Sequence, residues 1–214
     1  LVVRYNGAFY PSLGFRVICD YLHVPATHIL VTPGRHIILR GAQRPGADSP
    51  RDIVIPIDRQ GNMIINYIGA WERFKHYPLE RILAASNKRI EREILQEELA
   101  GKIVVIGDVS TGTSDVGAVP LDASFPLSGL HRNVIHTILT ENFLGELFVP
   151  EMLLIEAVLL GLLLVLALRF GSRAFAIGAL GLAVGYVSLG ILGFLYGHVI
   201  ANLVRPLLML IFAT

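Results

Sequence analysis

The sequence contains little cysteine and little charge, and both shortages exclude classes of protein. Its single cysteine, Cys19, cannot form an intrachain disulfide, and no Cys/His set has the spacing of a zinc site. Charged residues make up 16% of the 214 residues, whereas an ordinary soluble domain has about a quarter. The net charge of +1, with no clustered basic face, argues against nucleic acid as a partner. We predict no metal site and no cofactor.

The C-terminal third is strongly apolar and predicts membrane helices. A spanning helix needs about 20 apolar residues. Runs at about 152–170, 174–196 and 199–214 approach that length, although the last stops short of it. We therefore predict two domains, residues 1–149 and a bundle of about three transmembrane helices over 150–214. The first domain is expected to be N-terminally truncated, because the chain starts at Leu1 and not at Met. The alternative is a hydrophobic helical hairpin buried in a soluble core.

The positive charges beside the apolar runs predict an orientation. Arg169 and Arg173 flank the first short loop, so the positive-inside rule places residues 171–173 in the cytoplasm. Residues 1–149 then lie outside, in the periplasm or the extracellular space. The protein is thus predicted to be a multi-pass protein of the inner (plasma) membrane, with the lipid bilayer as a partner.

Two kinds of residue stand out within the predicted spans. Glu156 and Arg205 each lie roughly 9 Å inside the outer end of a helix, and we expect them to pair across helices, or else to snorkel separately. Glycines four residues apart allow helix backbones to approach closely in lipid. The candidate packing positions are Gly181, Gly185, Gly193 and Gly197. Alternatively, they reflect only the general frequency of glycine in membrane helices.

The outer domain is predicted to have a mixed α/β fold, with a mixed sheet and helices. Helical periodicity covers about 11–22, 79–84, 89–99 and 130–142. Short apolar runs at 28–31 and 36–39 surround a Pro33-Gly34 turn, and 53–56 and 63–67 have the pattern of a β-hairpin. The continuous apolar run at 103–107 is typical of a strand buried on both faces of a parallel sheet, and a long loop is expected over 108–128.

The start of that loop is rich in glycine and hydroxyl side chains. It does not match a phosphate-binding loop, because Thr113 stands where the lysine is required. Open α/β sheets usually bind ligands at strand ends, so the candidate ligand-binding residues here are Asp108, Ser110, Thr111, Thr113 and Asp115. The alternatives are a solvated connection without a ligand and, with His131, a hydrolase site that lacks the Gly-x-Ser-x-Gly elbow. Histidine can also sense pH, but the sequence singles out no histidine for that role.

Four motifs resemble the CHASE2 domain, an extracellular sensor module of bacterial receptors. The matching segments are Asp58-Arg59-Gln60-Gly61 with Ile64–Gly69, Gly101–Gly107, Asp115 with Val119-Pro120-Leu121, and Gly129, His131 and Asn133 with Ile138-Leu139-Thr140. The resemblance covers most of residues 10–214. This chain departs from the family pattern at Ser128, Arg132 and Val119, where Pro, Ala and Thr are usual. His131 and Asn133 complete the set of candidate ligand-binding residues.

The resemblance implies a sensory receptor. In this family a cytoplasmic output module follows the spans, such as an adenylate or guanylate cyclase, a histidine kinase, a diguanylate cyclase or a Ser/Thr kinase. We therefore predict that residues 1–149 sense an unknown small ligand and that the spans, in a homodimer, transmit the signal. The fragment itself is expected not to be catalytic. The alternatives are a membrane-tethered assembly module without a ligand and a membrane-tethered hydrolase.

Overall fold

The structure, a computed structural model, describes residues 1–109 and 115–212. The chain divides into two compact units, Leu1–Glu141 and Asn142–Thr214, which are described separately below. Ser110, Thr111 and Thr113, three of the predicted ligand-binding residues, lie outside the described residues.

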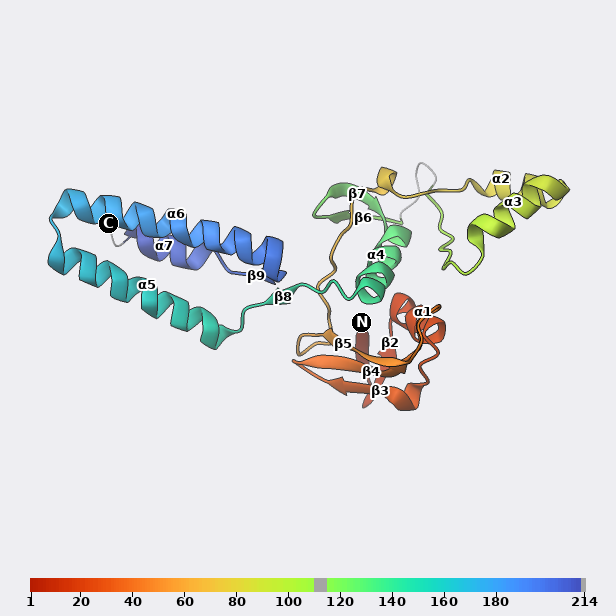
Figure 1. Ribbon diagram of the computed structural model, residues 1–214, viewed down its shortest axis with the longest axis horizontal. Coiled ribbons are helices and arrows are strands. Elements are labelled where there is room, and N and C mark those ends of the chain that lie inside the picture. The colour runs from red at the N-terminus through yellow and green to blue at the C-terminus, as the bar shows by residue number, and fades with distance from the viewer. Residues whose placement is uncertain (110–114, 213–214) are drawn as a thin grey trace. The chain divides into compact units, whose positions relative to one another are not determined.

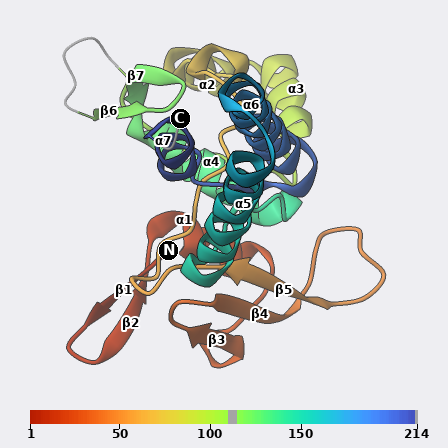
Figure 2. The same ribbon diagram turned by 90° about the vertical axis from the view of Figure 1, so that its left-hand side faces the viewer.

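A three-stranded antiparallel sheet forms part of the core of the first unit. Its strands β3 (Ile29–Thr32), β4 (His36–Ala42) and β5 (Arg51–Pro56) lie in that order (Figure 1, Figure 2). Ile37 pairs with Ile55 and Leu39 with Ile53, and all four side chains are fully buried. The alternation of these apolar residues places them on one face of the sheet. The predicted turn at Pro33-Gly34 joins β3 to β4, with Gly34 at a φ of +75°.

The other described elements of this unit are two hairpins, four α-helices and two 3₁₀ helices. The hairpins are β1 (Val2–Tyr5) with β2 (Ala8–Pro11) and β6 (Val116–Val119) with β7 (Asp122–Pro126). The helices are α1 (Leu13–Tyr21), α2 (Leu79–Ser86), α3 (Arg89–Leu99) and α4 (Leu127–Thr140). Two short 3₁₀ helices, η1 (Ala26–His28) and η2 (Trp71–Arg73), complete the described elements. The helix predictions are confirmed, with ends shifted by a few residues.

Helix α4 is central to this unit because it packs on α1 and contacts β7. Phe15 and Ile18 of α1 and Ile138 of α4 are almost completely buried. By contrast, the described contacts of α2 and α3 are mainly with each other. In α3, Leu95 is buried, whereas Ile90 is exposed.

Two strand predictions were wrong. Strand β5 pairs with β4 and not with residues 63–67, since the apolar side chains of β4 and β5 match in register. The backbone of residues 66–68 instead forms hydrogen bonds to side chains of α4. The apolar run 103–107 forms no strand, and Ile106 is 86% exposed. An apolar run becomes a buried strand only where neighbouring strands pair with it, and no described strand does so.

Two further predictions about the outer domain require correction. The described part of 108–128 is not one long loop, because it contains the β6–β7 hairpin and the first two residues of α4. The predicted mixed sheet is replaced by small sheets, and the described strands of residues 1–141 pair only antiparallel. Local hairpin connections produce this arrangement, since parallel pairs need long crossovers.

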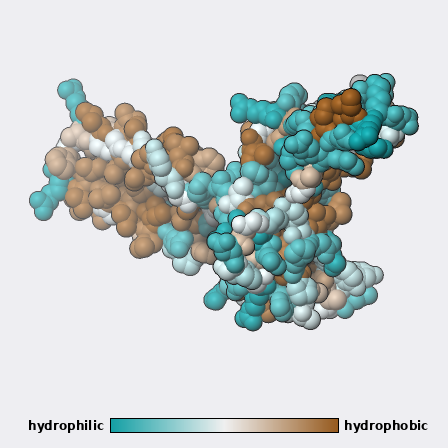
Figure 3. All heavy atoms as spheres, turned by 45° about the vertical axis from the view of Figure 1, so that its right-hand side comes forward, coloured by the Kyte–Doolittle hydropathy of each residue, from teal (hydrophilic) through white to brown (hydrophobic). Residues whose placement is uncertain are grey.

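The second unit is built from apolar helices. It contains α5 (Val149–Arg169), α6 (Ser172–Gly197) and α7 (Val204–Phe212), and a short parallel pair of β8 (Gly145–Glu146) and β9 (Val199–Ile200). In Figure 3 the surface of these helices is predominantly hydrophobic. Among the described residues, α5 and α6 are long and apolar enough to cross a membrane. In the third predicted span, 199–214, Val199 and Ile200 form strand β9, and the helix α7 that follows has nine residues.

Candidate functional site

Helix α4 carries two buried polar side chains that hold a neighbouring segment. Asn133 Oδ1 accepts a hydrogen bond from the Ile68 N–H at 3.2 Å, and Thr137 Oγ1 accepts one from the Asn66 N–H at 3.3 Å. Asn133 Nδ2 also donates to the Gly129 carbonyl at 3.0 Å. Both side chains are completely buried. The structure thus places Asn133, a predicted ligand-binding residue, in contact with the protein's own backbone.

An aromatic cluster covers the start of α4. Trp71, Phe74 and Phe125 meet edge to face, with ring centroids 6.0–6.5 Å apart. A Cβ atom on Gly129 would lie 2.7 Å from Phe125 Cε1 and 2.9 Å from Trp71 Cζ3. Only glycine fits there without movement of the rings, which explains in physical terms why the helix has a glycine at this position.

Gly107 lies against Ser128 in the first turn of α4. A Cβ atom on Gly107 would lie 2.6 Å from Ser128 Oγ, so this backbone approach also requires glycine. Ser128 is buried, and its hydroxyl has no hydrogen-bond partner within the described part of the chain. The end of the apolar run 103–107 is therefore held close to the helix start, as the sequence-based placement of the site requires.

The other predicted ligand-binding residues are not brought together by the described contacts. Asp108 and Asp115 are exposed and have interactions of their own. The Asp115 carbonyl accepts the Leu127 N–H at 3.0 Å and so ties the end of the loop to the first turn of α4. His131 lies half-buried on α4. A role for these three residues in ligand binding stays a prediction.

A basic cluster beside the aromatic rings was missed by sequence reasoning. The Arg132 guanidinium lies 3.8 Å from the centre of the Phe74 ring, and the His76 ring lies 4.1 Å from the Trp71 ring. Burial, followed by the charge of Arg132, lowers the pKa of His76 and of His136. The available signal was Arg132 itself, a charged side chain next to the candidate residues His131 and Asn133.

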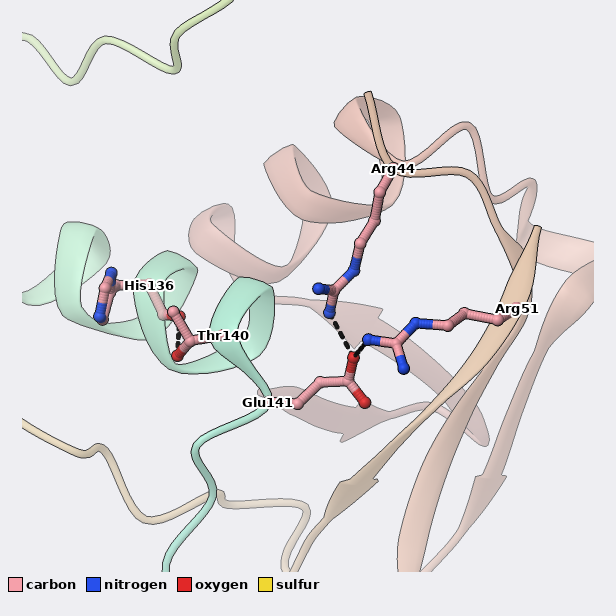
Figure 4. A network of polar contacts seen from close by, with 5 residues as sticks. All are labelled: Arg44, Arg51, His136, Thr140 and Glu141. Atoms are coloured by element: carbon pink, nitrogen blue, oxygen red, sulfur yellow. Dashed lines mark hydrogen bonds and ion pairs between the residues drawn. The ribbon is translucent and has the colours of Figure 1, made fainter. Parts of the chain in front are cut away.

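The C-terminal end of α4 is fixed by a second charged cluster. Glu141 accepts charge-assisted hydrogen bonds from Arg44 and Arg51, which lie at the two ends of the connection between β4 and β5 (Figure 4). The backbone of Glu141 is left-handed, with a φ of 53°. Non-glycine residues rarely adopt this conformation, so the ion pairs hold the chain in a turn that ends the helix. Glu141 is also the last residue of the first compact unit.

Comparison with known proteins identifies the family. The family model of the CHASE2 domain matches residues 1–168, which is more than half of the chain. The chain belongs to the CHASE2 family. No curated protein and no solved structure matches it. The resemblance seen in the sequence is therefore confirmed, and this CHASE2 domain belongs to a family of sensory domains.

The helices of the second unit contain the expected charged pair. Arg205 Nη2 lies 3.0 Å from Glu156 Oε2 and joins α7 to α5. The Glu156 side chain is 12% exposed and that of Arg205 is 64% exposed. Asn202 Oδ1 accepts the N–H groups of Val204 and Arg205 and so caps the start of α7.

The predicted glycine positions do not mediate close packing within this chain. Cβ atoms on Gly181, Gly185 and Gly193 would meet nothing within 4 Å, and one on Gly197 would make only an ordinary contact with Val199 at 3.8 Å. The tight approaches are at other glycines of α6. Gly178 lies against Leu166 of α5, and Gly190 lies against Leu203, with hypothetical Cβ distances of 2.9 and 2.7 Å. The spacing rule therefore did not find the glycines that pack within the chain.

Proposed function

We propose that this chain is the extracytoplasmic sensory domain of a membrane receptor, together with the helices that transmit its state to a cytoplasmic output module. Family membership supports the sensory role. The two long apolar helices support membrane attachment. In this proposal the output module is a nucleotide cyclase or a protein kinase, and the ligand is a small molecule bound near the start of α4.

The observation that carries the proposal is the position of α4 in the chain. Its first turns carry His131 and Asn133, two of the candidate ligand-binding residues, and its last turn ends at the Glu141 ion pairs. Only residues 142–148 separate Glu141 from α5, the first candidate span. A change at either end of α4 can therefore reach the span through a short connection, provided that the ligand binds two states with different affinity.

Within the second unit, backbone hydrogen bonds tie this connection to the segment that follows α6. The Gly145 N–H donates to the His198 carbonyl at 2.9 Å, and the Leu147 N–H donates to the Ile200 carbonyl at 3.4 Å. Because these bonds join the entrance of α5 to the exit of α6, a movement of the connection acts on both candidate spans. In the intact receptor, Leu144→Gly with Glu146→Gly should uncouple output but leave ligand affinity unchanged. Unchanged output would refute the rigid connection.

Single-cysteine labelling tests the proposed orientation. In a Cys19→Ser background, Ser49→Cys and Ser172→Cys place matched probes at exposed serines of the outer domain and of the start of α6. A membrane-impermeant maleimide should label position 49 in intact cells, and position 172 only after permeabilisation. The reverse pattern would place the sensory domain in the cytoplasm and refute the receptor topology.

The gene beyond Thr214 tests the output module. A cyclase or kinase reading frame after the helices would support transmission into the cytoplasm. A stop codon shortly after the helices would favour a binding or assembly protein instead.

The open faces at Gly181, Gly185 and Gly193 suit contact with a second copy of the chain, so we further propose that the receptor is a homodimer in the membrane.

A further inference from the structure

Arg132 carries a charge that is not neutralised by an ion pair in residues 1–109 and 115–212. The guanidinium is half-buried, and it stacks on the Phe74 ring with its central carbon 3.8 Å from the ring centre. Stacking uses the flat face of the guanidinium and leaves its N–H edges available. Those edges form the planar fork that binds carboxylates and phosphates with two parallel hydrogen bonds.

Two imidazoles lie in the same electrostatic environment. His136 follows Arg132 by one helical turn and so lies on the same face of α4. His76 lies on the Trp71 ring, which meets Phe74 edge to face. Burial contributes most to the lowered pKa of each imidazole, and the charge of Arg132 comes next. The cluster thus consists of three basic groups, of which Arg132 and His76 lie against aromatic rings.

One neighbouring carboxylate, Glu72, acts on this cluster. Glu72 raises the pKa of His76, but by less than burial and Arg132 lower it. The charged groups on the elements around α4 are Arg16 and Asp20 of α1, Glu72 and Arg73 of η2, and Asp122 of β7. Arg16 and Asp20 form an ion pair with each other, and Asp122 Oδ1 accepts the Ser124 N–H.

We propose that Arg132, His76 and His136 bind a small oxyanion, a carboxylate or a phosphate, as the ligand of this sensory domain. This rests on the proposed sensory function and names the chemical class of its ligand. The anion accepts hydrogen bonds from the edge of the guanidinium, and its charge favours the protonated form of both imidazoles. Because binding therefore takes up protons, affinity rises as the pH falls through the range in which the imidazoles titrate.

The single tryptophan makes the site observable by intrinsic fluorescence, since Trp71 lies directly on His76. The full chain, in nanodiscs of zwitterionic lipid, is titrated with inorganic phosphate and separately with acetate. We expect a saturable change in Trp71 emission, with affinity about tenfold higher at about pH 5.5 than at about pH 8. If emission responds only when anionic lipid is present in the disc, the site holds an anion whose source is a lipid headgroup.

Substitutions separate the roles of the three residues. Arg132→Gln should weaken phosphate binding by about tenfold or more, and Arg132→Lys, which keeps the charge without the planar fork, should bind with intermediate affinity. The matched control is Arg89→Gln, at an exposed arginine of α3, and its affinity should be unchanged. His76→Gln with His136→Gln should remove the pH dependence of acetate binding, since acetate itself stays ionised over this range, but retain binding at the higher pH.

Two results would overturn the proposal. One is the lack of a saturable response to phosphate, acetate and anionic lipid alike at both pH values. The other is a response of unchanged affinity in Arg132→Gln. Since the readout is local to Trp71, such a failure concerns the anion site alone, whereas the labelling and uncoupling experiments test the sensory function separately.

Discussion

The Glu141 cluster yields a prediction whose magnitude follows from the structure. Glu141 receives charge-assisted hydrogen bonds from two arginines, each worth about 1.5–3 kcal/mol when well formed. The side chains of Glu141, Arg44 and Arg51 are 27%, 28% and 57% exposed, so solvent screens the Arg51 pair most. We expect Glu141→Gln to lower the free energy of unfolding by about 2 kcal/mol in total.

The left-handed backbone of Glu141 makes a second contribution to the free energy of unfolding, and this contribution opposes that of the ion pairs. A left-handed non-glycine residue costs about 1 kcal/mol, and glycine does not incur this cost. Glu141→Gly should therefore be more stable than Glu141→Ala by about 1 kcal/mol, although both lose the ion pairs. In a double-mutant cycle, the coupling of Glu141 to Arg44 should exceed its coupling to Arg51, because Arg44 is the more buried partner.

Denaturation of the full chain in nanodiscs, followed through Trp71, measures these differences. A change of about 2 kcal/mol corresponds to a shift of about 4–8 °C in the melting temperature for a chain of this size. Glu97→Gln, at an exposed glutamate on α3, is the control and should change stability by less than about 0.5 kcal/mol. If Glu141→Gln behaves like this control, the ion pairs do not hold the end of α4. If Glu141→Ala equals Glu141→Gly, the left-handed turn is refuted.

Three further perturbations test other parts of the structure. Gly61→Ala would place a Cβ atom 2.7 Å from the Val2 carbonyl oxygen at a φ of +86°. It should therefore lower the free energy of unfolding by about 2 kcal/mol and increase amide exchange in β1. Native exchange rates in this variant would contradict the packing of Gly61 on Val2. Burial raises the pKa of the Cys19 thiol to about 11, so maleimide at about pH 8 should label Cys19 only after unfolding. Rapid labelling of the folded chain would show that α1 is not packed. Arg205→Gln leaves the Glu156 carboxylate buried and unpaired and should destabilise the helices by about 2 kcal/mol. The double change with Glu156→Gln should cost less than the sum of the two single changes, and strict additivity would refute the ion pair.

The sequence alone predicted those features that depend on local pattern. The spacing of apolar residues located the four helices of the outer domain, and the Pro33-Gly34 turn located the β3–β4 hairpin. Hydropathy and length located α5 and α6 within a few residues. The opposite charges of Glu156 and Arg205, both costly in an apolar environment, also predicted their contact correctly. In each case the physical cause acts within one element, or it is a charge in an apolar environment that requires an opposite charge beside it.

Only the tertiary structure decided which segments of the chain pair with one another. The runs 53–56 and 63–67 have compatible strand patterns, yet β5 pairs with β4, while Asn133 and Thr137 bind the backbone near residues 66–68. The clusters around Arg132 and Glu141 join residues that are far apart in the sequence. Periodicity indicates which face of a segment is apolar. Hydrogen-bonding groups and charges, however, pair with whichever groups the fold brings within about 3 Å. That distance is a property of the folded chain, and no local pattern contains it.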